Sequence, residues 1–153
     1  ISMLTGACGH TYGNHNIWQM WDVEHKPVSF ARTTWSRALD HSGSFQMGYM
    51  RELFESLQWQ KLITGDYHIL NDSPASFQVV ALAEDETLML AYTADGSELT
   101  INLDKLKPEK IEAVWFNPRD GERQRIGEFE SNGEQTFKPH SHGRGSDWVL
   151  LLK

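Results

Sequence analysis

A polar, glycine-rich run near the N-terminus carries the residue types best suited to ligand binding. It contains His10, Tyr12, Asn14 and His15, and Trp18 follows closely. Imidazole and carboxamide groups hydrogen-bond to hydroxyls, and aromatic rings cover C–H faces, so this mixture suits a neutral, hydroxyl-rich ligand. The run comes directly after a short apolar segment, which favours a strand end opening into a loop. Loops of that kind often carry function.

The same region offers two other chemistries, which the spacing supports less well. His10, His15, Glu24 and His25 have ligand types that metals accept, but their spacing matches no defined site. Glu24 and Asp22 are the nearest carboxylates, and a general acid needs a raised pKa that burial would have to supply. Exposed loop acids are the ordinary case. Because the single cysteine also forms no internal disulfide and no zinc motif, we expect neither a metal nor a cofactor.

Composition narrows the classes of partner. The chain has 153 residues, of which 39% are hydrophobic and 23% charged, as in a globular protein. A formal net charge of −7 argues against nucleic acid or an anionic membrane surface, because both need basic patches. The sequence contains no apolar run of about 18 residues that could span a bilayer. The start at Ile1 lacks the features of a signal peptide and could belong to a processed product or a fragment.

The first sixty residues predict helices. A short apolar segment over 4–8 would be a strand or a helix end. Apolar positions recur from Phe30 to Leu39 with helical spacing, which predicts a helix of about three turns. A second helix should place Phe45, Leu53 and Leu57 on one face and end near residue 59.

Beyond residue 65 the apolar period changes to two. The predicted strands cover 77–83, 88–93, 99–103, 111–116, 123–129 and 148–152. Leu99, Ile101 and Leu103 alternate with polar residues and predict one buried face. The turn sequences at 95–96 and 118–121 predict hairpins. Short strands at this spacing indicate a β-sandwich.

These patterns divide the chain into two parts, residues 1–62 and residues 63–153. A sandwich of about ninety residues can carry its own core, whereas one strand and two amphipathic helices need a sheet to pack against. Trp35, Trp59, Trp115 and Trp148 fall on apolar faces, where we expect core or interdomain packing.

Two segments of the sequence resemble one known family, in the family's order. The run 6–15 with Trp18 and Gln19 looks like the eighth-strand region of apiosidase-like barrel proteins (glycoside hydrolase family 140 and relatives), and Ala31, Arg32, Trp35, Gln46 and Met47 resemble the helices after it. Segments 114–121 and 147–150 resemble the family's C-terminal sandwich, which is described as a putative collagen-binding domain. The resemblance implies an α+β chain: the last strand, over 6–12, and the helices of a (β/α)8 barrel, followed by an all-β antiparallel sandwich.

In such a barrel the active site lies at the C-terminal ends of the strands. The resemblance therefore implies that His10, Tyr12, Asn14, His15 and Trp18 form part of a sugar-contact wall. The alternative is that Tyr12 and Trp18 are packing residues and His10 is structural. Glycosidases need two carboxylates, which the family carries on earlier strands. No position in this chain matches them, so we expect no catalytic residue here.

The resemblance implies a parent glycoside hydrolase that acts on plant-type or other complex polysaccharide. The partners would be an oligo- or polysaccharide and the remaining barrel segment, as a separate or cleaved chain. If the barrel segment is a second polypeptide, Ala7, Met50 and Phe54 would be buried against it. Family members look exported, which implies a periplasmic or extracellular location in a bacterium. The alternative function is a non-catalytic carbohydrate-binding or protein-binding module.

Overall fold

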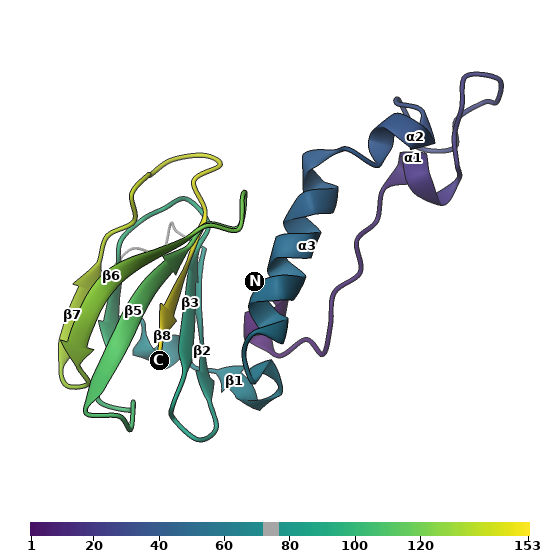
Figure 1. Cartoon of the computed structure of the whole chain (residues 1–153). Coiled ribbons are helices and arrows are strands. Elements are labelled where there is room, and N and C mark those ends of the chain that lie inside the picture. The colour runs from purple at the N-terminus through teal and green to yellow at the C-terminus, as the bar shows by residue number, and fades with distance from the viewer. Residues whose placement is uncertain (72–76) are drawn as a thin grey trace.

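The computed structural model describes residues 1–71 and 77–153. A β-sandwich forms the C-terminal part, a long helix lies beside it, and an arm made of loops and two short helices projects away (Figure 1). The predicted α+β class, with helices first and an antiparallel sandwich second, is confirmed. Within the described ranges, no helix combines the length and apolar character needed to cross a bilayer.

The sandwich consists of a six-stranded and a two-stranded sheet, both antiparallel. The larger sheet has the order β1-β2-β3-β8-β5-β6 and the smaller sheet pairs β4 with β7. The strands are β1 (Leu62–Thr64), β2 (Gln78–Ala83), β3 (Met89–Thr93), β4 (Leu99–Asn102), β5 (Lys110–Phe116), β6 (Arg123–Glu130), β7 (Glu134–Phe137) and β8 (Trp148–Leu152). All six predicted strands are present, and β1 and β7 are additional.

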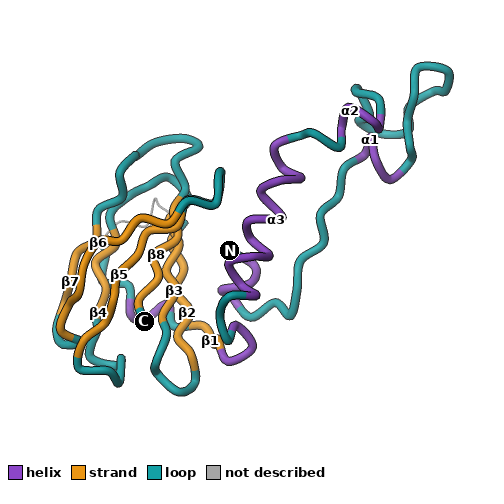
Figure 2. Tube along the Cα trace, viewed as in Figure 1, coloured by secondary structure: helices purple, strands orange, loops and turns teal. Residues whose placement is uncertain are grey.

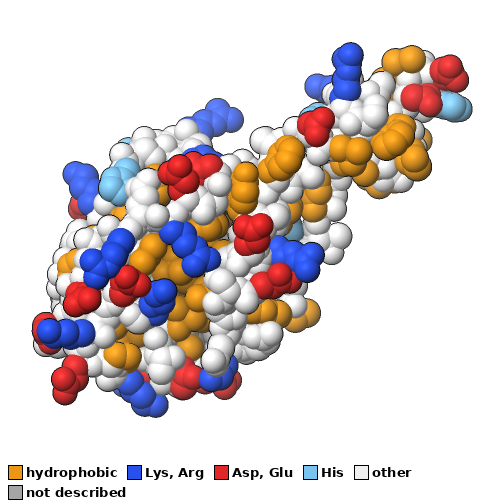
Figure 3. Space-filling view, in the orientation of Figure 1, with side chains coloured by type: hydrophobic (Ala, Val, Ile, Leu, Met, Phe, Trp, Pro, Cys, Tyr) orange, Lys and Arg blue, Asp and Glu red, His pale blue; other side chains and the backbone are white. Residues whose placement is uncertain are grey.

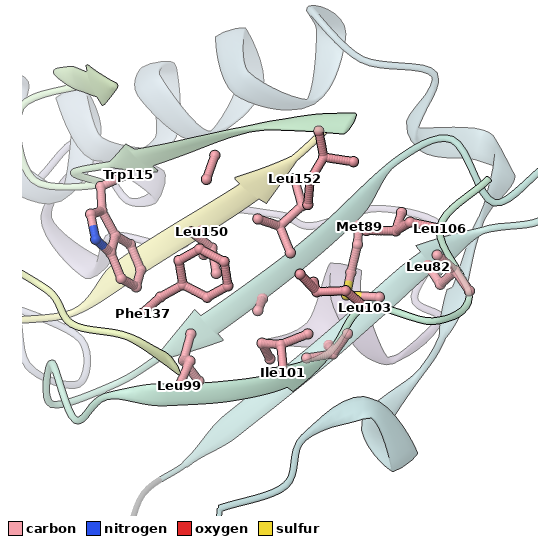
Figure 4. Close-up of a cluster of buried hydrophobic side chains, with 14 of the residues drawn as sticks. Leu82, Met89, Leu99, Ile101, Leu103, Leu106, Trp115, Phe137, Leu150 and Leu152 are labelled. Carbon is pink, nitrogen blue, oxygen red and sulfur yellow. The ribbon is translucent and has the colours of Figure 1, made fainter. Parts of the chain in front are cut away.

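The core lies between the two sheets (Figure 4). Leu99 and Ile101 on β4 point toward Trp115 and Leu150 of the larger sheet, and all four side chains are buried. Their neighbours Thr100 and Asn102 are half-exposed, so the predicted alternation on this strand is confirmed. Of the four tryptophans expected to pack, Trp115 and Trp148 are buried, and the other two are half-buried.

The opposite face of the larger sheet is covered by α3 (Ser42–Glu55) and by the 3-10 turn η1 (Ser2–Thr5). Leu53 of α3 and Leu4 of η1 pack there against Leu90 and Leu151. Because both faces of the sheet are covered, β8 is buried along its whole length. The coverage explains why its sequence shows a continuous apolar run instead of an alternation.

Two turns of the sandwich had been predicted as hairpins. The turn at 118–121 does join the antiparallel pair β5 and β6. The prediction at Asp95–Gly96 is wrong, because β3 and β4 belong to different sheets. The Asp95 carboxylate accepts a hydrogen bond from the Ser97 amide at 3.0 Å, and Gly96 adopts φ 71° against the loop that carries Ser141. The turn therefore carries the chain across the sandwich.

Of the two helices predicted from apolar spacing in the first sixty residues, one forms and the other forms only in part. The second predicted helix is α3, which ends at Glu55. The three-turn helix predicted over 30–39 is wrong: only α2 (Trp35–Ala38) forms (Figure 2). The carboxamide oxygen of Asn16 accepts bonds from the amides of Arg32 and Thr33, at 2.8 and 3.0 Å, and holds this backbone in a loop.

The strand expected over 6–12 is also absent. This segment is an extended loop, and no described strand pairs with it. A strand needs a hydrogen-bonded neighbour, which a barrel would provide. The chain then enters α1 (His15–Trp18), which lies against α2 at the outer end of the arm (Figure 1).

Candidate functional site

The outer end of the arm is held together by two asparagines. Asn14 caps α1, and its side-chain oxygen accepts bonds from the Asn16 amide at 3.0 Å and from Asn16 Nδ2 at 2.8 Å. Asn16 in turn holds the loop before α2. These contacts fix the direction in which the loop of predicted site residues enters the helix.

Tyr12 and Asn14 are brought together with a residue that the sequence prediction missed, His41. The Asn14 carboxamide nitrogen lies 3.3 Å from the Tyr12 hydroxyl and 3.3 Å from His41 Nδ1. The Tyr12 ring lies over Gly43 in the first turn of α3, where a β-carbon would be only 3.1 Å from the Tyr12 oxygen. Nothing in the local sequence could signal this contact, because Asn14 and His41 are 27 residues apart.

His15 and Trp18 form a second cluster on α1. The indole nitrogen of Trp18 donates to His15 Nδ1 at 3.1 Å, and the His15 ring also makes an edge contact with Phe30. Since an indole N–H can only donate, the neutral His15 ring carries its proton on Nε2. Trp18 nevertheless remains 60% exposed. The pair therefore presents an aromatic face and a donor to the surroundings.

His10 is separate from both clusters. It lines a cleft of about 390 Å³ between α3 and the sandwich, together with Met47, Met50 and Phe54. Met50 and Phe54 are half-buried and face this chain's own sandwich across the cleft. In a split protein these two side chains would instead be buried against a second chain.

A polar group stands at the sandwich side of this cleft. The Arg119 guanidinium pairs with Asp147 at 2.9 Å and lies 5.0 Å from the centre of the Trp148 ring. Burial, with a further contribution from the Asp147 carboxylate, raises the pKa of Tyr92 to about 12. Tyr92 therefore stays neutral at physiological pH, and the cleft is mostly apolar with one internally paired ion pair.

In the described part of the chain, the histidines and acidic residues around 10–25 form no group that could hold a metal ion. His25 pairs with Asp22 at 2.7 Å on the exposed loop, and this hydrogen bond lowers the pKa of the Asp22 carboxyl. Across the described ranges, no group of three or more His, Cys, Asp or Glu side chains could hold a metal ion. Asp22, with its lowered pKa, is a poor general acid, because that role needs a raised pKa.

The space-filling view shows hydrophobic side chains gathered along the arm (Figure 3). The large side chains exposed on the arm are Tyr12, Trp18, Met20, Val23, Val28, Phe30 and Leu39, and Phe45 is exposed on the adjoining α3. Soluble proteins rarely leave so many apolar groups together on a surface without a partner.

Two family models match consecutive parts of the chain. A family model described as "Apiosidase-like, catalytic domain" matches residues 1–61, and one described as "Putative collagen-binding domain of a collagenase" matches residues 60–153. No curated protein matches the sequence.

Solved structures match the fold over nearly the whole chain. One described as a glycoside hydrolase has a TM-score of 0.90 at 25% identity and matches 99% of this chain and 34% of its own. A glycoside hydrolase family 5 structure from Bacteroides vulgatus ATCC 8482 has a TM-score of 0.89 at 26% identity, over 99% of this chain and 33% of its own. This chain thus spans about a third of each.

The chain therefore belongs to the family of the "Putative collagen-binding domain of a collagenase", preceded by the C-terminal end of an apiosidase-like catalytic domain.

Proposed function

We propose that this chain is the C-terminal part of a glycoside hydrolase that acts on plant-type or other complex polysaccharide. The arm supplies one wall of the sugar pocket, and the sandwich is a structural support. The two parts meet near residue 62, where the first strand of the large sheet begins. The catalytic carboxylates belong to the rest of the catalytic domain.

The arm is the observation that carries this proposal. It is ordered by its own hydrogen bonds through Asn14, Asn16 and Gln19, yet it leaves a row of large apolar side chains exposed. A segment with fixed geometry and an uncovered apolar surface is suited to packing against a further domain. The remaining barrel segment is the partner that fits, since the family match covers only the end of a catalytic domain.

The donors on the arm suit a sugar ligand. Tyr12 accepts a bond from Asn14, which leaves its own O–H free to donate, and His15 carries a proton on Nε2. Trp18 adds an exposed ring for the C–H face of a pyranose or furanose. His10 lies apart from the other residues of the wall and lines the cleft beside the sandwich.

The test is kinetic and uses the full-length protein. We expect Tyr12→Phe and Trp18→Ala to reduce release of sugar from apiose-bearing pectin oligosaccharides while thermal unfolding stays nearly unchanged. Ile126→Ala on the sandwich is the control for loss of an exposed apolar side chain outside the proposed sites, since Ile126 is 39% exposed. Unaltered turnover in both arm variants would remove the proposed pocket wall.

A binding role for the sandwich is the second candidate. Its family description names collagen, and Tyr67 and Phe77 are 68% and 75% exposed on it. Exposed aromatic side chains are common anchors for protein or carbohydrate ligands. A protein comprising residues 61–153 should then be retained on a collagen or glycan matrix and lose retention with Tyr67→Ala. Passage through all such matrices would exclude this role.

A further inference from the structure

His41 occupies the position just before α3, but its side chain makes no capping bond to that helix. Its ring instead faces the loop of site residues, with Nδ1 3.3 Å from the Asn14 carboxamide nitrogen. A histidine at this position is therefore held by the arm and not by its own helix. It is half-buried, so part of the ring remains accessible.

The hydrogen-bonding capacity of Asn14 is used within the protein. Its oxygen accepts from the amide and the side chain of Asn16, and its nitrogen donates toward both Tyr12 and His41. A carboxamide has two N–H groups and one oxygen, so little remains for a ligand. Asn14 is thus a positioning residue that holds the rings of Tyr12 and His41 on either side of it.

This arrangement fixes the proton of His41. Because the Asn14 amide nitrogen can only donate, His41 Nδ1 is the acceptor and the neutral ring carries its proton on Nε2. Among the described residues, no group is bonded to that nitrogen. The Tyr12 hydroxyl hydrogen is free for the same reason. Two donors are therefore fixed by a single carboxamide.

We propose that His41 is a further sugar-binding residue, whose Nε2–H donates to a hydroxyl or ring oxygen of the sugar beside the Tyr12 hydroxyl. This inference rests on the proposed glycosidase function. From the sequence, sugar contacts are expected only over residues 10–18. The proposal adds a binding residue at the start of α3.

Two conservative variants of the full-length protein separate binding from support. His41→Asn keeps an acceptor near the Nδ1 position and removes the Nε2 donor, whereas His41→Gln places an amide donor near Nε2. We expect His41→Asn to raise KM about tenfold, which is the loss of one hydrogen bond, with kcat and melting temperature little changed. His41→Gln should recover most of that loss. His142→Asn, on a loop of the sandwich, is the matched control.

The probes are 4-nitrophenyl apioside and apiose-bearing pectin oligosaccharides. If Tyr12→Phe raises KM and His41→Asn does not, His41 has no binding role and the inference is overturned. If both His41 variants lose activity together with a fall in melting temperature, His41 is a structural residue, and the inference is overturned as well. If the unaltered protein releases sugar neither from these probes nor from other complex polysaccharides, the proposed function fails and the inference falls with it.

Discussion

Leu53 joins α3 to the sandwich, and truncation of its side chain should destabilise the two together. Its side chain is 2% exposed and packs on the outer face of the large sheet with Leu4, Leu90 and Leu151. Leu53→Ala deletes three carbon atoms at about 0.8 kcal/mol each and leaves a cavity, so we expect a loss of about 3 kcal/mol in the free energy of unfolding. Phe45 lies on the same helix but is 54% exposed. Phe45→Ala should cost well under 1 kcal/mol.

Urea denaturation of the two variants, followed by far-ultraviolet circular dichroism and tryptophan fluorescence, measures this difference. Trp115 and Trp148 report on the sandwich core, where both are buried. If α3 and the sandwich unfold as one unit, both signals should shift together to lower urea in Leu53→Ala. Equal shifts for Leu53→Ala and Phe45→Ala, or no shift for either, would refute the packing argument.

Three further substitutions test other parts of the structure. His68 is buried with Nε2 unpaired among the described groups, and burial lowers its pKa below 6.5. As the pH drops, the unfolded chain therefore binds a proton at His68 before the folded chain does, and the free energy of unfolding should fall below about pH 6.5. In urea titrations at several pH values, His68→Asn should flatten this pH dependence. Gly96→Ala would place a β-carbon 2.1 Å from the Ser141 carbonyl oxygen at a φ of 71° and should lower the melting temperature by several degrees; an unchanged value would contradict the close approach. Gly43→Ala should displace Tyr12 and weaken sugar turnover while leaving α3 as stable or more stable, because alanine favours helices; equal turnover would mean that Tyr12 is not needed there.

The sandwich could be predicted from sequence because its strands carry their own signals. Leu99 and Ile101 alternate with polar neighbours, and the turn at 118–121 has the residues that a hairpin needs. The strands β1 and β7 were missed because neither carries a long apolar run: Leu62–Thr64 has only three residues, and Glu134–Phe137 buries one side chain fully. Pairing with a neighbour, and not local propensity, makes these two segments strands.

The arm could be predicted less well, for a different physical reason. The apolar spacing from Phe30 to Leu39 is helical, but the Asn16 side chain binds the amides of Arg32 and Thr33, and the helix begins only at Trp35. A long-range side-chain bond of this kind leaves no trace in local periodicity. The contact of His41 with Asn14 was missed for the same reason, and it is the one that completes the candidate site.

The two faces of the large sheet decide what the sandwich can do. One face is committed to β4 and β7 and the other to α3 and η1, so neither is available as a flat binding surface. The places left for a ligand of the sandwich are its edges and loops, where Tyr67 and Phe77 are exposed, and the cleft beside α3. The burial of Leu4 and Leu53 against the sheet also means that the sandwich fixes the base of α3, and α3 carries His41 and Gly43 at its other end. The sandwich is thus joined through one helix to the residues of the proposed sugar site, and this packing is the physical basis for the proposed support role.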